Sequence, residues 1–251
     1  MAIELDDVVP EVVPEVATSV LADRAIRQRD LVPPAALAAY HALVVGVGAV
    51  GRQVALQLAA MGVPALTLID HDTVSIENLA VQGYRYDDLG LPKVDATAAW
   101  ARELNPAADV LALHERFRRA SAESIPSLRS LSGGSRPLRL AVFACVDSMS
   151  GRRIVWETLR SSAAFHCDGR MAGEVIRVLA STEPAVDERY ALTLFDDASA
   201  HPAPCTGRST LYAASLAAAL MVSRFALHLR CIVPPRDAIL NLLAGELVTT
   251  D

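Results

Sequence analysis

The stretch Leu-Val-Val-Gly-Val-Gly-Ala-Val-Gly at residues 43–51 decides the fold class of this chain. A short apolar run enters a glycine-rich turn, and a second apolar run follows at residues 54–61. A third apolar run at residues 65–69 ends in an acidic segment at 70–72. Strand, turn, helix and strand in this order make a mononucleotide-binding half. The sequence therefore predicts an α/β fold with a Rossmann-like, mostly parallel sheet flanked by helices.

Each glycine of this turn has a physical role. Gly46 permits the tight turn, Gly48 lets the backbone approach a phosphate, and Gly51 lets the helix pack closely against the strand. The predicted helix begins near Ala49 and Val50, where unpaired N–H groups and a partial positive charge favour an anion. We therefore expect these five residues to bind the phosphates of a nucleotide.

The residues after the second strand indicate which nucleotide. Asp70 stands where an acidic residue that binds ribose hydroxyls is expected, and Asp72, Asn78, Gln82 and Lys93 follow it. A nicotinamide enzyme has no use for a lysine and amides here, because its redox carrier supplies the chemistry. Cleavage of the α–β bond of ATP needs such groups, because charge builds on the phosphates. We therefore expect ATP, with Asp70 at the ribose and Lys93 at the developing charge.

An aspartate follows the next apolar run. Residues 138–145 lead into Asp147, and Arg152 and Arg153 open the following predicted helix. The carboxyl end of a strand in such a sheet faces the ligand crevice, and Mg²⁺ prefers oxygen ligands. Asp147 is therefore the candidate metal ligand, with capping of the helix as its alternative role.

Several separate motifs make the chain resemble a known family. They are R-x-x-R-Q at 24–28, the glycine turn at 46–51, D-x-D-x-V at 70–74, N-L at 78–79, P-K-V at 92–94 and D-S at 147–148. Together they resemble the ThiF/MoeB adenylyltransferases, bacterial relatives of ubiquitin-activating enzymes. The resemblance implies that ATP and Mg²⁺ are used to adenylate a carboxylate, usually the C-terminal glycine of a ubiquitin-like or sulfur-carrier protein. It also implies a homodimer in which Arg27 reaches into the partner subunit's nucleotide site.

Two departures mark the chain as a divergent member. The family's N-L-x-R-Q motif ends here in Val81 and Gln82, so an arginine that contacts the triphosphate in the family is missing. Arg52, Arg85 and Arg152 are the candidates to replace it. The four cysteines are isolated from one another, with no C-x-x-C pair, so the structural zinc of many relatives is not expected.

Cys205 is the candidate nucleophile of the second half. It lies in a predicted loop at 204–209, just ahead of a long predicted helix, and thioester-forming relatives carry their nucleophile in the corresponding region. A helix N-terminus and the nearby Arg208 would lower the pKa of the thiol. The alternative is a small residue packed under the loop. Cys145 and Cys167 are expected to be strand and core residues.

Three other functions stay open. A nicotinamide oxidoreductase could use the same glycine turn, and a related dehydratase could activate a carboxylate on a modified tRNA. A noncatalytic ThiF-like scaffold subunit is favoured by the loss of the arginine at Val81. If an acceptor tail binds, Arg170 and Glu174 are candidates to line its path.

Composition limits the class of protein, its partners and its compartment. The chain has 251 residues, 52% of them hydrophobic, which suffices for one sizeable core. The net charge is −6 and no basic stripe occurs, so we expect no nucleic-acid partner. The longest apolar stretch, 211–222, is shorter than the about 20 residues that span a bilayer. The acidic start at residues 4–7 and the unpaired cysteines favour the cytoplasm and no membrane association.

The expected organisation is a flexible tail at 1–19 and a single domain at 20–251. That domain divides into a nucleotide-binding half at about 41–160 and an acceptor and dimer half at about 161–230. We predict helices at 20–30 and 210–229, and strands near 165, at 175–180 and at 190–194. Antiparallel strands of the second half should extend the parallel sheet.

Overall fold

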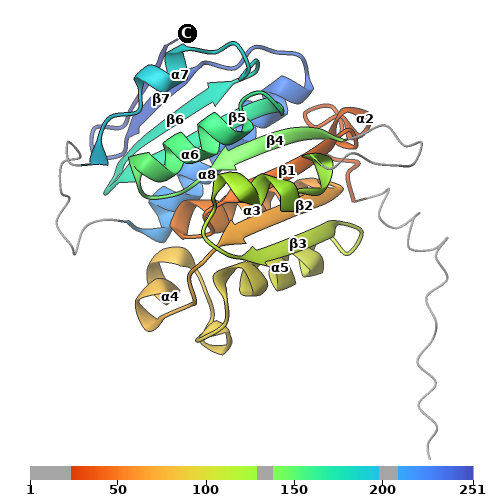
Figure 1. Cartoon of the computed structure of the whole chain (residues 1–251), viewed down its shortest axis with the longest axis vertical. Coiled ribbons are helices and arrows are strands. Elements are labelled where there is room, and N and C mark those ends of the chain that lie inside the picture. Colours follow the sequence, from red (N-terminus) through yellow and green to blue (C-terminus); the bar gives the residue numbers. More distant parts are fainter. Residues whose placement is uncertain (1–23, 129–137, 198–208, 251) are drawn as a thin grey trace, which may run out of the picture.

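The computed structural model describes residues 24–128, 138–197 and 209–250, which build one eight-stranded sheet (Figure 1). The spatial order of the strands is β3-β2-β1-β4-β5-β6-β7-β8. The first five strands in this order, β3, β2, β1, β4 and β5, are parallel, and the β5–β6, β6–β7 and β7–β8 pairs are antiparallel. The bounds are β1 Tyr40–Val45, β2 Ala65–Asp70, β3 Asp109–His114, β4 Arg139–Ala144, β5 Ala163–Ala172, β6 Val175–Ser181, β7 Asp237–Asn241 and β8 Glu246–Thr250. This confirms the predicted fold class.

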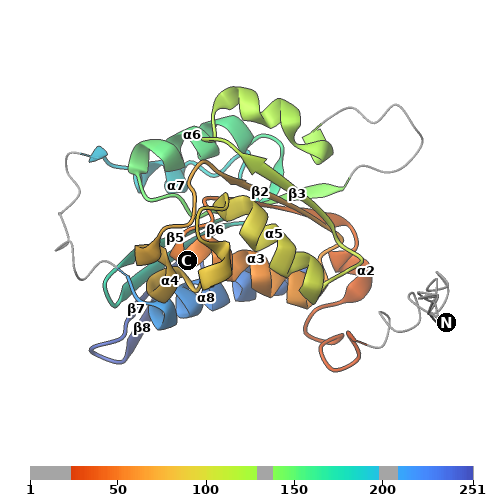
Figure 2. The ribbon, with the colours of Figure 1, turned by 90° about the horizontal axis from the view of Figure 1, so that it is seen from below.

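Helices cover both faces of the sheet, as the edge-on view shows (Figure 2). One face carries α3 Ala49–Met61, α5 Lys93–Leu104 and α8 Leu211–Leu229, and the other carries α6 Met149–Leu159 and two 3-10 turns, Arg119–Ser124 and Pro126–Leu128. Short helices are α2 Pro34–Leu37, α4 Ile76–Gln82 and α7 Arg189–Leu192, with a 3-10 turn at Tyr86–Asp88. Because α3 leaves β1 on one face and α6 leaves β4 on the other, the strand order reverses between β1 and β4. Ligands of open α/β sheets bind at the carboxyl ends of such strands.

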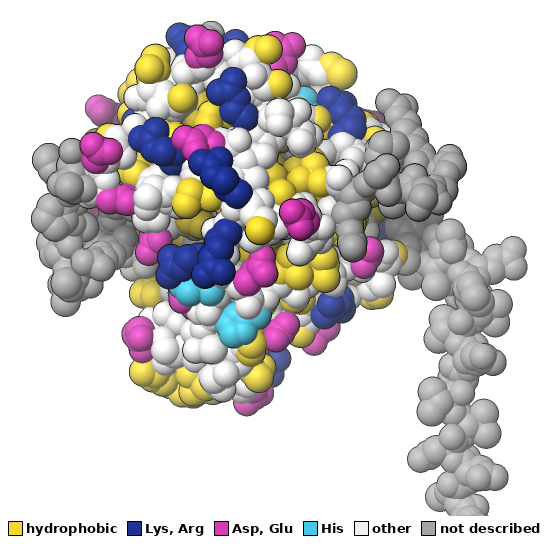
Figure 3. Space-filling view, in the orientation of Figure 1, with side chains coloured by type: hydrophobic (Ala, Val, Ile, Leu, Met, Phe, Trp, Pro, Cys, Tyr) yellow, Lys and Arg dark blue, Asp and Glu magenta, His cyan; other side chains and the backbone are white. Residues whose placement is uncertain are grey.

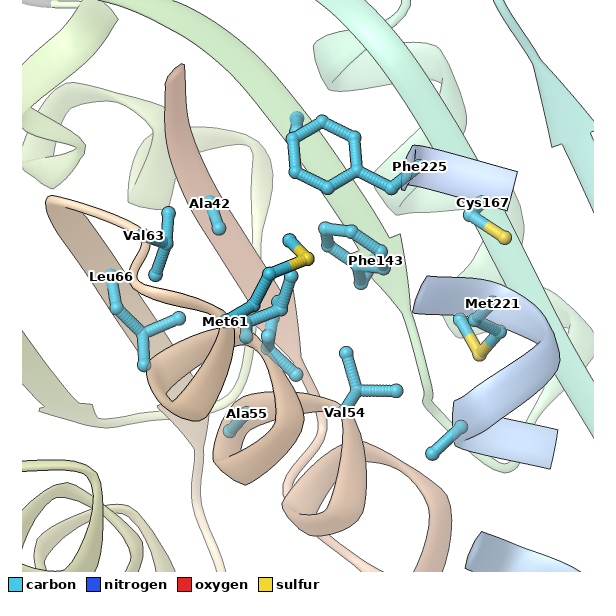
Figure 4. Close-up of a cluster of buried hydrophobic side chains, with 14 of the residues drawn as sticks. Ala42, Val54, Ala55, Met61, Val63, Leu66, Phe143, Cys167, Met221 and Phe225 are labelled. Carbon is cyan, nitrogen blue, oxygen red and sulfur yellow. The ribbon is translucent and has the colours of Figure 1, made fainter. Parts of the chain in front are cut away.

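An alanine-rich face of α8 closes the core over the sheet. Met221 and Phe225 of this helix lie against Phe143 of β4 and Cys167 of β5, with Val54 of α3 nearby (Figure 4). By length and composition alone the 19-residue helix could cross a membrane. In this structure its buried residues pack on α3 and β5, so it forms part of the hydrophobic core.

Residues 24–30 form hydrogen-bonded turns, so the described part of the helix predicted at 20–30 is wrong. Its apolar residue Ile26 is 57% exposed and buries no face, and a short helix without tertiary packing is unstable. Its polar side chains hydrogen-bond the end of α3 instead: Arg24 donates to the Ala60 carbonyl and Gln28 to the Met61 carbonyl.

Residues 190–194 are likewise not the predicted strand. Arg189–Leu192 is the short helix α7, and Asp187 Oδ1 accepts hydrogen bonds from the first N–H groups of this segment. β6 already pairs with β5 on one side and β7 on the other, so no edge is free for another strand. The sheet continues past residue 230, where we had expected the second half to end, through the β7–β8 hairpin.

Candidate functional site

The glycine turn after β1 is held open by backbone contacts. Gly46 has a φ of +86°, and a side chain there would lie 2.8 Å from the Cys145 carbonyl oxygen. A Cβ at Gly51 would overlap the Gly46 carbonyl oxygen and come within 2.9 Å of Cys145 Cβ. A Cβ at Gly48 would meet nothing within 4 Å. Glycine is therefore required at two positions by close packing, whereas the space over Gly48 is free for a ligand.

The N-terminus of α3 points its unpaired donors at that space. Gly48 is its N-cap, and no side chain in the described residues caps it. The first N–H groups of a helix have no intrahelical acceptor, and the helix dipole adds a partial positive charge. This end of α3 therefore has the donors and the charge that suit a phosphate group.

Asp70 anchors the turn. It ends β2, is 9% exposed, and accepts hydrogen bonds from Val47 N at 2.7 Å and Asp72 N at 2.9 Å on separate oxygens. The Gly46 N–H bonds the Ile69 carbonyl at 2.8 Å. Both carboxylate oxygens of Asp70 thus serve the backbone, and the neighbouring carboxylate of Asp72, with a side chain 49% exposed, is the one that faces solvent.

Lys93 is held beside the turn by Asp72. Its Nζ lies 2.9 Å from Asp72 Oδ2, and its backbone N–H bonds the Asp72 carbonyl at the same distance. Lys93 is 5% exposed and is the only lysine in the chain. Burial disfavours the charged carboxylate, but the hydrogen bond and charge of Lys93 outweigh it, so the pKa of Asp72 is lowered from 3.8. A cation is thus positioned at the start of α5, where the helix dipole alone would disfavour it.

A basic rim borders Asp72. Arg116, on the loop after β3, places its guanidinium 2.6 Å from Nε2 of His71, and His114 Nε2 lies 2.9 Å from the His71 carbonyl. The same Nε2 of His71 lies 3.4 Å from Asp72 Oδ1, so the histidine stands between Arg116 and that carboxylate. Histidine side chains lie beside basic and acidic ones on the face seen in Figure 3. The rim adds positive charge next to the exposed carboxylate.

The amides of α4 have different surroundings. Asn78 Oδ1 accepts the N–H and hydroxyl of Ser75 in a capping box at the start of the helix. Gln82, at the last position of α4, has a buried Oε1 with no hydrogen-bond partner. Val81 beside it offers no polar group. An orphaned buried acceptor is uncommon in proteins and is a site for a missing donor.

Asp147 follows β4 and is exposed. It does not cap α6, because Ser148 is the N-cap and Asp197 accepts the N–H groups of Met149 and Ser150. The loop carrying Asp147 is adjacent to the glycine turn, since Cys145 N donates to the Val45 carbonyl. An exposed carboxylate with no hydrogen bond among the described residues fits Mg²⁺, which prefers a few carboxylate ligands with water and phosphate oxygens.

Two other candidates, Arg27 and Arg170, are not brought to this site. Arg27 is exposed in the turns at the far end of α3, a helix about 20 Å long. Arg170 is buried against Asp168, whose carboxylate also accepts from Arg152 and Tyr190. Cys205 lies outside the described residues.

Cys145, Cys167 and Glu174 are placed as follows. Burial raises the pKa of Cys145 to about 12 and that of Cys167 well above its ordinary value, as expected for inert core thiols. Glu174 sits beyond the end of β5 and accepts from the Tyr212 hydroxyl. Neither cysteine is therefore a nucleophile in this structure.

Sequence reasoning missed Tyr84. Its hydroxyl donates to the Val47 carbonyl at 2.6 Å and lies 3.1 Å from Thr97 Oγ1 and 3.4 Å from the Lys93 carbonyl. It therefore ties the glycine turn to the start of α5. No periodicity marks this residue in the sequence, because its partners lie up to 37 positions away.

Comparison with known proteins agrees with this geometry. The model of the ThiF family matches residues 24–233. The fungal adenylyltransferase and sulfurtransferase uba4 of Aspergillus niger is 31% identical over 137 residues, 51% of this chain and 26% of that protein. Molybdopterin-synthase adenylyltransferase of Haemophilus influenzae is 37% identical over 92 residues, 36% of this chain and 38% of that protein. The matched region thus spans well under half the length of these curated relatives.

Solved structures share the fold. PaaA superposes with a TM-score of 0.67 at 20% identity, covering 99% of this chain and 77% of PaaA. Escherichia coli MccB, solved with ATP, gives 0.62 at 14% identity, covering 86% of this chain and 64% of MccB. TcdA gives 0.63 at 21% identity, covering 88% of this chain and 98% of TcdA.

Proposed function

The chain belongs to the ThiF family, and from this membership and the geometry of the site we propose that it transfers AMP from ATP to a carboxylate and releases pyrophosphate. The observation that carries the proposal is the uncapped N-terminus of α3 facing open space at Gly48, with the Lys93–Asp72 pair beside it. A redox carrier has no need of a buried lysine at this place, whereas a triphosphate under cleavage does.

Backbone groups and side chains bind different parts of ATP. The phosphates lie against Gly46, Gly48 and the first N–H groups of α3. Asp72, the exposed carboxylate, binds the ribose hydroxyls, and Asp70 holds the turn in shape. This assignment moves the ribose contact two residues on from where we first expected it. Of the two α4 amides, Gln82 contributes its buried acceptor to the nucleotide site, whereas the Asn78 oxygen is already bonded to Ser75 in the capping box.

The reaction needs alignment more than proton transfer. An ionised acceptor carboxylate attacks the α-phosphorus, its new O–P bond forms as the bond to the β-phosphate oxygen breaks, and pyrophosphate leaves with the electron pair. No general base takes part, because the attacking oxygen carries no proton. Lys93 stabilises the charge that develops on the phosphate oxygens. Asp147 would hold Mg²⁺, which when bound neutralises phosphate charge.

The acceptor, the assembly and the later steps form the finer part of the proposal. Relatives named as uba4 and molybdopterin-synthase adenylyltransferase point to a protein with a C-terminal glycine carboxylate, and a peptide or small carboxylate is the other acceptor class. The protein acts as a homodimer in the cytoplasm, with Arg27 crossing to the partner's site. In a second step the Cys205 thiolate attacks the acyl carbon of the adenylate and forms a thioester, while the bond to the AMP oxygen breaks and AMP leaves.

Pyrophosphate exchange tests the adenylation. Purified protein is mixed with ATP, Mg²⁺ and labelled pyrophosphate, with and without candidate proteins that end in Gly-Gly. We expect acceptor-dependent exchange, with a loss of about 10²- to 10³-fold in Lys93→Met or Asp147→Asn. Arg119→Met, in an exposed ion pair with Glu157, is the matched control and should exchange normally. Tight NADH binding with no ATP binding would overturn the proposal.

The single lysine permits a direct test of the nucleotide position. An amine-reactive ATP analogue can modify only Lys93 and the N-terminus, so peptide mapping after labelling reports on one side chain. We expect labelling of Lys93 that unlabelled ATP suppresses and NADH does not. Equal protection by both nucleotides, or by neither, contradicts the placement of the triphosphate.

Two further measurements address the assembly and the thiol. Mixed Arg27→Ala and Asp147→Ala subunits should regain partial exchange activity if each site is shared between two chains. Cys205→Ser should retain exchange and lose an acyl adduct that thiol reagents release. No recovery in freely exchanging subunits, or an adduct in Cys205→Ser, counts against the corresponding role.

A noncatalytic scaffold subunit is the second candidate, and Val81 is the observation that favours it. ATP binding without exchange, under several acceptors, would support this function and exclude the enzyme.

A further inference from the structure

The α4 helix lacks a cation that the nucleotide chemistry requires. Val81 occupies the position of the arginine in the N-L-x-R-Q motif, and Gln82 leaves a buried Oε1 unpartnered next to it. Three arginines of the chain were candidates to supply the charge, and their surroundings now separate them.

Two of the three are already engaged. Arg152 is 5% exposed and pairs with the buried carboxylate of Asp168. Arg85 pairs with Asp87 at 3.1 Å and has a side chain that is 53% exposed. Both guanidinium groups are therefore already paired with a carboxylate.

Arg52 differs from both. It is the fourth residue of α3 and is 4% exposed, yet none of the ion pairs or side-chain hydrogen bonds found in the described ranges involves its guanidinium. Its Nε is buried without a partner. The guanidinium carbon lies 4.7 Å over the Tyr84 ring and 6.0 Å from the Trp100 ring. Burial lowers the pKa of Arg52, and electrostatic interactions with Tyr84 and Asp88 oppose this shift.

The guanidinium of Arg52 lies beside the end of α4, the helix that lacks the arginine. Its Nη1 lies 3.5 Å from where a Cβ at Gly83 would stand, two residues after Val81. The ring beneath it belongs to Tyr84, whose hydroxyl bonds the glycine turn at Val47 and approaches the Lys93 carbonyl. The guanidinium is therefore fixed at the same end of the sheet as the glycine turn and Lys93.

We propose that Arg52 binds the triphosphate of ATP and takes the place of the arginine that Val81 lacks; this rests on the function proposed above. A buried, unpaired cation is costly, and an anion brought to it removes that cost. An arginine stacked on aromatic rings is pre-organised, so little side-chain entropy is lost when it bonds phosphate oxygens. The chain thus carries the required positive charge on α3, at the foot of the glycine turn, in place of α4.

Calorimetry with ligands of different phosphate content tests the proposal. Arg52→Met keeps the apolar stem and removes the charge. We expect it to bind ATP and pyrophosphate about 10- to 100-fold more weakly, the range for a lost hydrogen bond to a charged group, and to bind adenosine as the wild type does. Arg85→Met, which removes the neighbouring guanidinium 5.5 Å from the Trp100 ring, is the matched control and should change none of these affinities.

Thermal melting separates binding from structure. A binding role predicts that ligand-free Arg52→Met melts no lower than the wild type, while the stabilisation by ATP is reduced. Lower melting with equal losses for ATP and adenosine would show a structural role and overturn the proposal. If Arg52→Met does not fold, Arg52→Lys carries the same comparison, with part of the pyrophosphate affinity retained.

Two different results separate the role of Arg52 from the proposed function. Wild-type protein that ignores ATP and pyrophosphate would refute the proposed function, and this inference with it. Wild-type protein that binds ATP, with an Arg52→Met variant that binds it equally well, would refute the role of Arg52 alone.

Discussion

Asp70→Asn separates a carboxylate that holds the glycine turn from one that binds ribose. Asp70 is 9% exposed, and its two oxygens accept the N–H groups of Val47 and Asp72. Asparagine has almost the same shape but offers one acceptor oxygen. Its NH₂ group must then face the second backbone N–H.

The loss of stability in Asp70→Asn can be worked out from these two hydrogen bonds. A hydrogen bond to a charged group contributes about 1.5–3 kcal/mol. Asparagine loses one such bond, weakens the other because its oxygen is uncharged, and sets a donor against a buried donor. We expect the free energy of unfolding to fall by about 2–4 kcal/mol. For a chain of this size the melting temperature then falls by about 4–16 °C.

Urea unfolding of the ligand-free protein, followed by tryptophan fluorescence, measures the effect. Asp72→Asn is the matched control, because its side chain is 49% exposed and the amide oxygen still accepts from Lys93. We expect the control to lose less than about 1 kcal/mol of stability and to bind ATP more weakly.

The opposite pattern would refute the reasoning. If ligand-free Asp70→Asn unfolds at the wild-type urea concentration and loses only ATP affinity, the carboxylate is a ligand contact and the turn is held by other groups.

Three further outcomes are expected. Gly51→Ala should unfold the protein or lower its stability severely, because the added methyl overlaps the Gly46 carbonyl oxygen. Gly48→Ala should leave the stability in urea unchanged and weaken ATP binding, because the space over Gly48 is open. Equal stability of the two variants would contradict the difference in packing. The pKa of Asp72, followed by NMR, should lie below 3.8 and rise in Lys93→Met. Since the pKa is lower in the folded than in the unfolded protein, the Lys93–Asp72 pair contributes stability above pH 3.8 that is lost as the pH falls through the folded pKa. An unchanged titration of Asp72 in the variant would contradict the coupling. Burial lowers the pKa of His41 to about 4. As the pH falls, the unfolded chain therefore takes up a proton at this histidine before the folded chain does, and the free energy of unfolding should decline between pH 6.5 and about 4. The same decline in a His41→Gln protein would show that another group causes it.

Local patterns predicted the first strands and the helix between them correctly. β1, the glycine turn, α3 and β2 follow one another within about thirty residues, and their apolar periodicity reflects burial that each element needs on its own. Lys93 and Asp147 were candidates because of their places after turns and strands, and the structure sets the segments that carry them near the glycine turn. The α8 helix was placed within one residue of its start because its apolar run is long.

Contacts between distant segments could not be read in this way. The partners of Tyr84 and the isolation of Arg52 depend on how α3, α4 and α5 come together in space. The segment at 190–194 has the composition of a strand, but β7 already occupies the sheet edge beside β6. The turns at 24–30 have helical propensity, but no core face receives them.

The sequence by itself determined the family and the order of the first strands, because a glycine turn between an apolar strand and a helix has one favourable geometry. Only the tertiary structure decided which polar group does what. Asp70 turned out to serve the backbone, Asp72 to face solvent, and Arg52 to remain unpaired, since burial and hydrogen bonding are set by residues brought together from separate parts of the chain.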